Sequence, residues 1–319
     1  MTASLPVLAA VVRSGFVESR HTGSLVALDG SGRVALAVGD VDAAVLPRSA
    51  NKPLQAAAMV RAGLDLDGSL LALVAASHSG EPLHVEGVLD ILAEAGLGPD
   101  SLGNAGGLPL DPDAQRAVTA SEGGPEPLLH NCSGKHAGML ATCVRAGWPV
   151  DGYLSPDHPG QRHITAVIEE LAGEDVAAVV VDGCGAPQHA LTLIGLARAF
   201  RALVVAPASA PEGRVAAAMR AHPWWAGGTG RPVTRLLAGV KGLVVKDGAE
   251  GVMAAATVDG TAVAVKIADG GQRAAVPVLV AALASRGVDV AAVADLGTVP
   301  VLGGGRPVGE LRVTGIGGR

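Results

Sequence analysis

Strand-like apolar segments lie near both ends of this chain, and its middle third has the composition of helices. Asp29-Gly30-Ser31-Gly32 between two such segments is a typical hairpin turn. Strands separated by a helical stretch of this length are most simply accommodated in one antiparallel sheet flanked by helices. We therefore predict a single α+β domain over residues 1–319. The strand candidates are residues 7–13, 24–30, 32–39, 176–181, 242–246, 252–257 and 262–270.

Helix candidates are recognised by apolar periodicity and by glycine stops such as Gly63 and Gly147. Residues 68–76 form a buried segment, a Gly/Pro/Asp-rich loop extends to about residue 127, and the glycine-rich tail after residue 286 is predicted to be irregular. The helix candidates are residues 54–62, 84–95, 137–146, 161–171, 190–202, 211–221 and 274–286.

Charge and composition exclude several classes of protein. The net charge of −6 argues against nucleic acid or an anionic membrane as the main partner. The first residues lack a basic segment followed by a long apolar run, and charges, glycines and prolines interrupt every apolar stretch. Three cysteines in 319 residues do not suit a disulfide scaffold. We expect a cytoplasmic protein.

The stretch Arg48-Ser49-Ala50-Asn51-Lys52-Pro53 contains a Ser-x-x-Lys spacing. In the first turn of a helix this spacing places a hydroxyl and an amine on one face, as a serine nucleophile with a lysine base requires. The alternative is an N-cap serine and a solvated lysine. Because Pro53 disfavours helical geometry at Lys52, the helix must begin at or just before Ser49, or at Pro53 itself.

Ser77 and Lys266 are the candidates for completing such a site. Ser77-His78-Ser79 ends a buried segment and opens a loop, although these residues could simply cap the next helix. Lys266 lies on a late strand and could be an ordinary outward-facing lysine. Serine acyl-enzymes of the Ser-x-x-Lys type use a middle serine and a late-strand lysine in this order.

Two loop cysteines suggest a metal site. Cys132 and Cys184 are each flanked by glycine and polar residues, and His136 or Asp182 could supply a third zinc ligand if the loops meet. The alternative is two buried structural cysteines. Cys143 falls among apolar helical residues and is expected in the core.

Six stretches together resemble the rhizobial-type (class 3) L-asparaginases, in that family's order. They are Arg48-Ser-Ala-Asn-Lys-Pro, Ala76-Ser-His-Ser-Gly-Glu, Asn131-Cys-Ser-Gly-Lys-His-Ala-Gly-Met-Leu, Pro156-Asp-His-Pro-Gly-Gln, Asp182-Gly-Cys-Gly-Ala-Pro and Val265-Lys-Ile-Ala-Asp-Gly. The resemblance implies a sandwich like that of serine β-lactamases, penicillin-binding proteins and glutaminases, with an antiparallel sheet flanked by helices. It also implies hydrolysis of L-asparagine to L-aspartate and ammonia by a homodimer.

The resemblance also implies roles for individual residues. Ser49 would be the nucleophile and Lys52 its base, Ser77 and Lys266 a second Ser-Lys pair, and Arg48 a positive charge that favours neutral lysines. A zinc ion would be held by Cys132, Lys135 and Cys184, and Lys135 here replaces His136 only because of the resemblance. The residues expected to contact substrate are Asp182, His78 and Asn131. Other readings are a β-lactamase-like serine hydrolase or a non-catalytic zinc-binding protein of this fold.

Overall fold

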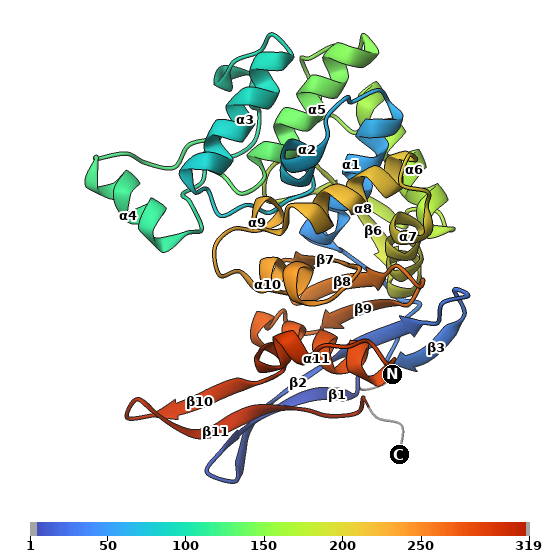
Figure 1. The fold of residues 1–319 in the computed structure, drawn as a ribbon, viewed down its shortest axis with the longest axis vertical. Coiled ribbons are helices and arrows are strands. Elements are labelled where there is room, and N and C mark those ends of the chain that lie inside the picture. The colour runs from blue at the N-terminus through green and yellow to red at the C-terminus, as the bar shows by residue number, and fades with distance from the viewer. Residues whose placement is uncertain (1–4, 317–319) are drawn as a thin grey trace. The chain divides into compact units, whose positions relative to one another are not determined.

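The computed structural model describes residues 5–316, which divide into two compact units. The first, here called the sheet unit, comprises residues 5–50, 190–205 and 236–316. The second, the helical unit, comprises residues 51–189 and 206–235. Figure 1 labels the elements of both units. The single-domain prediction is not tested by this division and stays a prediction.

The strands of the sheet unit form one large antiparallel sheet (Figure 1). Its order is β10-β11-β1-β2-β9-β8-β7, with β3 also paired to β2. Strands from both ends of the chain therefore share one sheet, as the sequence predicted. The strands are β1 (Val7–Arg13), β2 (Phe16–Leu28), β3 (Val34–Val38), β7 (Leu243–Gly248), β8 (Val252–Thr257), β9 (Ala262–Ile267), β10 (Val299–Gly303) and β11 (Arg306–Val313).

The core of the sheet unit lies around β8 and β9. Consecutive residues of both strands are fully buried, so both faces of this part of the sheet are covered, and the helices α7 (Leu193–Val205) and α11 (Gln272–Ser285) pack on these strands. Continuous apolar runs such as Val252–Thr257 are typical of strands buried on both faces. The register places Lys266 opposite Ser24 of β2, near the end of β9.

The helical unit holds most of the remaining helices, and its central member is α5. Gly134 and Gly138, one turn apart on α5, face α2: a Cβ on Gly134 would lie 2.6 Å from the Leu73 carbonyl oxygen. Only small residues allow this approach. The helices are α1 (Lys52–Arg61), α2 (Gly68–Val74), α3 (Pro82–Glu94), α4 (Pro112–Ala120), α5 (Ser133–Ala146), α6 (Pro159–Ala172), α8 (Pro211–Ala221) and α9 (Pro223–Ala226).

Smaller elements complete the chain. Strand β5 pairs with β6, and the end of β6 pairs with β4, so that Ala44 lies opposite Thr192. The bounds are β4 (Ala44–Val45), β5 (Ala178–Val181), β6 (Pro187–Thr192), α10 (Pro232–Gly239), and the 3-10 turns η1 (Arg48–Asn51), η2 (Pro99–Ser101) and η3 (Ala291–Gly297). No helix of residues 5–316 is long and apolar enough to cross a membrane.

Three sequence predictions are wrong. The tail is not irregular, because β10 and β11 form a hairpin that pairs with β1, with Val313 opposite Ala9. The loop before residue 127 contains α4, whose N-cap Asp111 accepts hydrogen bonds from two backbone amides. The helix predicted from residue 190 begins at Leu193, because the preceding residues belong to β6.

Candidate active site

Arg48 and Ser49 lie in the 3-10 turn η1, and Lys52 begins α1 directly after it. Helical turns thus begin just before Ser49, which is the first of the two alternatives that Pro53 left open, and Pro53 falls in the first turn of α1, where its missing N–H costs nothing. Ser49 is half-buried, whereas Lys52 is only 1% exposed.

The backbone of this segment is strained. Arg48 has φ of 53°, a left-handed conformation that costs free energy in a non-glycine residue. Gly248, at the end of β7, packs against the same segment, because a Cβ there would lie 2.1 Å from the Pro47 carbonyl oxygen and 3.3 Å from the Ala50 nitrogen. Within the sheet unit, β7 therefore sets the path of the chain on either side of Ser49.

Lys266 lies on the wall of an open pocket of about 860 Å³ in the sheet unit. Thr22, Ser24 and Asp40 also line this pocket. Partial burial lowers the pKa of Lys266, and the positive charge of Arg48 acts in the same direction. Its Nζ donates a hydrogen bond to the Glu250 carbonyl. The sheet unit thus brings Arg48 near Lys266, as the assigned role of Arg48 requires.

Lys52 and Ser77 are in direct contact within the helical unit. The Lys52 Nζ donates to Ser77 Oγ over 3.0 Å, to the Ala76 carbonyl over 2.7 Å and to the Asn131 carbonyl over 3.2 Å. An ammonium has three hydrogens, so these three acceptors saturate it. The structure therefore joins two residues that sequence reasoning had placed in separate Ser-Lys pairs.

His78 is buried, and both of its ring nitrogens are engaged within the protein. Its Nδ1 accepts from the Gly80 N–H over 3.1 Å, so Nε2 carries the hydrogen and donates to Ser133 Oγ over 2.9 Å. Burial, together with the charges of His84 and Lys52, holds the pKa of His78 well below its usual value. The neutral ring fixes the loop beside Ser77. Ser133 is a partner that the sequence did not indicate.

The two predicted metal-binding cysteines meet around Lys135. Lys135 Nζ lies 3.2 Å from Cys184 Sγ. The hydrogen bond between the two sulfurs lowers the pKa of Cys132 well below its usual value and raises that of Cys184, so Cys132 is the more acidic thiol of the pair. Burial works to lower the pKa of Lys135, but the interactions with Cys184 and then Cys132 outweigh it and the pKa is raised.

The donor chemistry of this cluster suits zinc. Two buried sulfurs and an amine converge, and a thiolate is already favoured at Cys132. Asp182 Oδ2 lies 4.0 Å from Cys184 Sγ. Within residues 5–316 no three His, Cys, Asp or Glu side chains are grouped closely enough to hold a metal. Because the expected set includes a lysine, that finding does not test it, and zinc stays a prediction.

The other predicted residues lie beside this cluster. Asn131 Oδ1 is 3.1 Å from Cys132 Sγ, and its carbonyl accepts from Lys52, so Asn131 links the sulfur cluster to the Lys52–Ser77 pair. His136, the alternative zinc ligand, contacts the Tyr153 hydroxyl through Nδ1, and its buried Nε2 has no hydrogen-bond partner among the residues that the structure describes.

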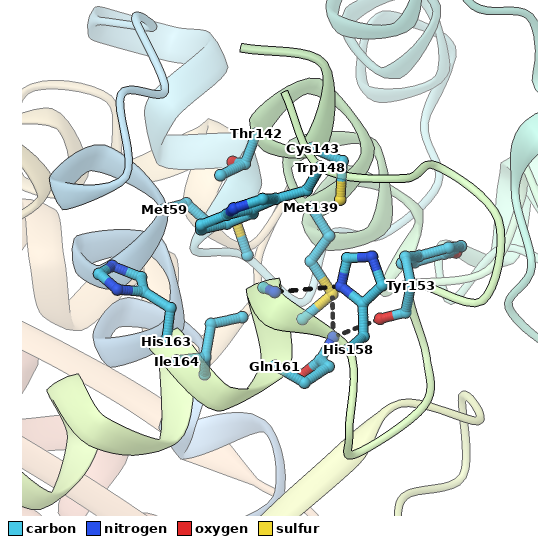
Figure 2. A pocket seen from close by; sticks show the side chains of 11 residues that line it. Met59, Met139, Thr142, Cys143, Trp148, Tyr153, His158, Gln161, His163 and Ile164 are labelled. Carbon is cyan, nitrogen blue, oxygen red and sulfur yellow. Dashed lines mark hydrogen bonds between the residues drawn. The ribbon is translucent and has the colours of Figure 1, made fainter. Parts of the chain in front are cut away.

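A separate small pocket is lined largely by residues of α5 and α6 (Figure 2). Figure 2 shows Met59, Met139 and Trp148 around it, and Gln161 bonded to the Tyr153 carbonyl. Its volume of about 10 Å³ holds at most one water molecule, so it is not a substrate site.

Residues 9–313 match the family model described as L-asparaginase II. The chain belongs to the L-asparaginase II family. The predicted family resemblance is confirmed, and membership supports the expectation of an amidohydrolase with a small-molecule substrate. No curated protein matches the chain.

Solved structures give a weaker likeness. The chain is 14% identical to Mglu in its native form, with a TM-score of 0.43, covering 87% of this chain and 67% of that one. The native form of Mglu in 4.3 M NaCl is 15% identical, with a TM-score of 0.44, and the match covers 85% of this chain and 62% of that one. The glutamate form of Mglu is 16% identical to the chain, with a TM-score of 0.35, and the match covers 87% of this chain and 64% of that one. The chain thus spans about two thirds of these proteins' length.

Proposed function

We propose that this family member hydrolyses L-asparagine to L-aspartate and ammonia through serine–lysine chemistry. The observation that carries the proposal is the family match over residues 9–313. The buried contact between Lys52 and Ser77 supports the chemistry. The proposal includes the sandwich of β-lactamases and glutaminases, for which the antiparallel sheet and its flanking helices are the support.

The reaction would proceed through an ester of Ser49. Ser49 Oγ attacks the side-chain amide carbon of asparagine and gives its proton to the neutral amine of Lys52. The Lys52 ammonium passes a proton through Ser77 Oγ to the departing nitrogen, which leaves as ammonia. Water then cleaves the aspartyl ester, releases aspartate and restores Ser49. The three acceptors around Lys52 Nζ stabilise the ammonium that exists after the first proton transfer.

The remaining predicted residues would complete the lysine pair and orient the substrate. Lys266, with Arg48 near it, would serve as the second lysine of the site, paired with Ser77. Cys132, Lys135 and Cys184 would hold zinc, with Asp182 beside it. When bound, the zinc would supply positive charge that binds and orients the substrate. Homodimer formation and a cytoplasmic location stay predictions.

An ammonia-release assay with L-asparagine, L-glutamine and small amides tests the proposed function. Release from L-asparagine is expected to exceed release from L-glutamine. Turnover of a chromogenic β-lactam with none of L-asparagine would indicate a penicillin-recognising hydrolase. Bound zinc without turnover of any amide would indicate a non-catalytic protein.

Gly248→Ala is expected to lower kcat by roughly tenfold to a hundredfold, because its Cβ would collide with the Pro47 carbonyl and move Ser49. Steady-state kinetics measure the loss. Gly98→Ala is the matched control, because a Cβ there meets no atom of residues 5–316 within 4 Å and φ is −119°. Equal effects of the two substitutions would remove Gly248 from the positioning of Ser49.

Arg48→Leu is expected to move the acid limb of the pH profile of kcat/KM to higher pH. As the second lysine of the site, paired with Ser77, Lys266 is proposed to act in its neutral form, which predominates above its pKa. Burial and then Arg48 lower the pKa of Lys266, so removing Arg48 raises that pKa. Arg48→Lys keeps the charge and should keep the limb in place. Exposed Arg306→Leu is a second control. An unmoved limb in Arg48→Leu contradicts the assignment.

Zinc content is expected to fall in Cys132→Ala and Cys184→Ala but not in Cys143→Ala. Cys143 is buried in α5, and burial raises its pKa to about 11, so it stays a thiol. Elemental analysis of protein purified without chelator measures the ratio of zinc to protein. Absence of zinc from the unsubstituted protein, with no uptake on titration, would refute the zinc site.

A further inference from the structure

The loop carrying Ser77 is held by a second segment of the helical unit, Trp224–Thr229, which the proposed function leaves unused. The carboxylate of Glu81 joins the loop to this segment through two hydrogen bonds. Its Oε1 accepts from the Thr229 backbone N–H over 2.8 Å, and its Oε2 accepts from Thr229 Oγ1 over 2.7 Å. Thr229 thus supplies a hydrogen-bond donor to each oxygen of the Glu81 carboxylate, at the end of the Ser77–Glu81 loop.

The direction of these hydrogen bonds is determined by Trp224. Its indole Nε1 lies 2.9 Å from Thr229 Oγ1, and an indole N–H can only donate. Thr229 Oγ1 therefore accepts from Trp224 and sends its own hydrogen to Glu81. The resulting chain has one polarity, and it ends on a charged acceptor, which makes the last hydrogen bond the strongest.

The middle of the same loop is held by the same segment. Ser79 Oγ donates to the Gly227 carbonyl over 2.9 Å. Gly228 has φ of 121°, and a Cβ there would lie 2.1 Å from Ser79 Oγ and 2.8 Å from Glu81 Oε1. Only glycine permits this backbone conformation and this approach.

An aromatic stack supports the contact from the side. The rings of His84 and Trp224 are stacked at 4.0 Å with an interplanar angle of 9°, and His84 Nε2 lies 3.2 Å from the Trp224 carbonyl oxygen. The ring of His84 also stacks on that of His78, with the ring centroids 5.3 Å apart. Because His78 directly follows Ser77, the stack connects Trp224 to the residue beside the serine.

We propose that Glu81, through Thr229 and Trp224, is a positioning residue for the Ser77–Lys52 pair. This rests on the proposed function, in which Ser77 Oγ passes the proton from Lys52. The contact between Ser77 and Lys52 is 3.0 Å long, and a shift of the loop by about 1 Å would break it. Glu81 itself touches neither reacting residue in this scheme and acts only through the loop.

Thr229→Val and Thr229→Ser form the matched test. The valine loses the hydroxyl that joins Trp224 to Glu81, whereas the serine keeps it. For Thr229→Val we expect kcat for L-asparagine to fall roughly tenfold while KM changes by less than about twofold, and Thr229→Ser should stay within about twofold of the unsubstituted protein. Glu86→Gln removes an exposed charge from α3, the helix that follows Glu81, and it should change neither kcat nor KM.

Coupling and fold are measured alongside. The double variant Glu81→Ala/Thr229→Val should lose no more kcat than Glu81→Ala alone, because Glu81→Ala already removes both hydrogen bonds from Thr229, whereas Thr229→Val removes only the one from the hydroxyl. If Thr229→Val does not fold, Trp224→Phe removes the indole N–H, keeps the ring stack, and should lower kcat in the same direction. Unchanged kcat in the folded variants, or an equal loss in Thr229→Ser, overturns the proposal.

Hydrogen exchange separates this inference from the proposed function. Mass spectrometry of the Ser77–Glu81 peptide needs no turnover, and exchange there should be faster in Thr229→Val than in Thr229→Ser or Glu86→Gln. If the unsubstituted protein releases no ammonia from L-asparagine, the proposed function fails and exchange alone decides the positioning. Equal exchange in all three variants overturns it.

Discussion

Ser49→Ala is expected to reduce kcat for L-asparagine by about 10⁴-fold or more, because no ester can form without the hydroxyl. Ser49 lies half-buried in η1, so losing one oxygen should leave the fold and the zinc content unchanged. Ammonia release in single-turnover and steady-state assays measures the effect. Ser209→Ala makes the same chemical change at an exposed serine in the turn between α7 and α8, and it is the control.

Trapping gives an independent measure of the same assignment. Acid quenching of the unsubstituted protein during turnover should yield an aspartyl ester on the peptide that contains Ser49, and Ser49→Ala should yield none. Full activity in Ser49→Ala, or an ester on a peptide containing Ser77 instead, would remove Ser49 from the role of nucleophile.

Lys52→Met is expected to lower kcat by about 10³-fold, because the proton acceptor for Ser49 and the donor to Ser77 are lost together. The Ala76 and Asn131 carbonyls also lose their donor. An unsatisfied buried carbonyl costs on the order of 1–3 kcal/mol, so some loss of thermal stability is expected as well. The two rates are therefore compared well below the melting temperature of the variant, so that the loss of kcat is measured on folded protein.

The control for this substitution is Lys241→Met, at an exposed lysine. It should change neither kcat nor the melting temperature. Lys52→Met protein that melts normally but keeps kcat within about tenfold of the unsubstituted protein would show that another group accepts the Ser49 proton.

Local sequence signals explain which parts of the fold could be predicted. Helix α5 was recognisable because Gly147 ends it in a left-handed conformation, with φ of 68°. Helix α4 was missed although its signal, Asp111 followed by Pro112, is an N-cap pattern, because the surrounding Gly/Pro-rich composition suggested a loop. The hairpin of β10 and β11 carries little local signal, since its pairing with β1 joins opposite ends of the chain.

The candidate residues themselves came from motifs in the sequence, because nucleophiles, thiols and their glycine-flanked turns are local features. Their partners came from tertiary structure. Lys52 meets Ser77 across 25 residues, Lys135 meets Cys184 across 49, and Glu81 meets Thr229 across 148. The sequence by itself determined the antiparallel sheet, the family and the chemical groups. Only packing, such as the close approach of α5 and α2 through Gly134, decided which of those groups touch, because no spacing along the chain encodes contacts between distant segments.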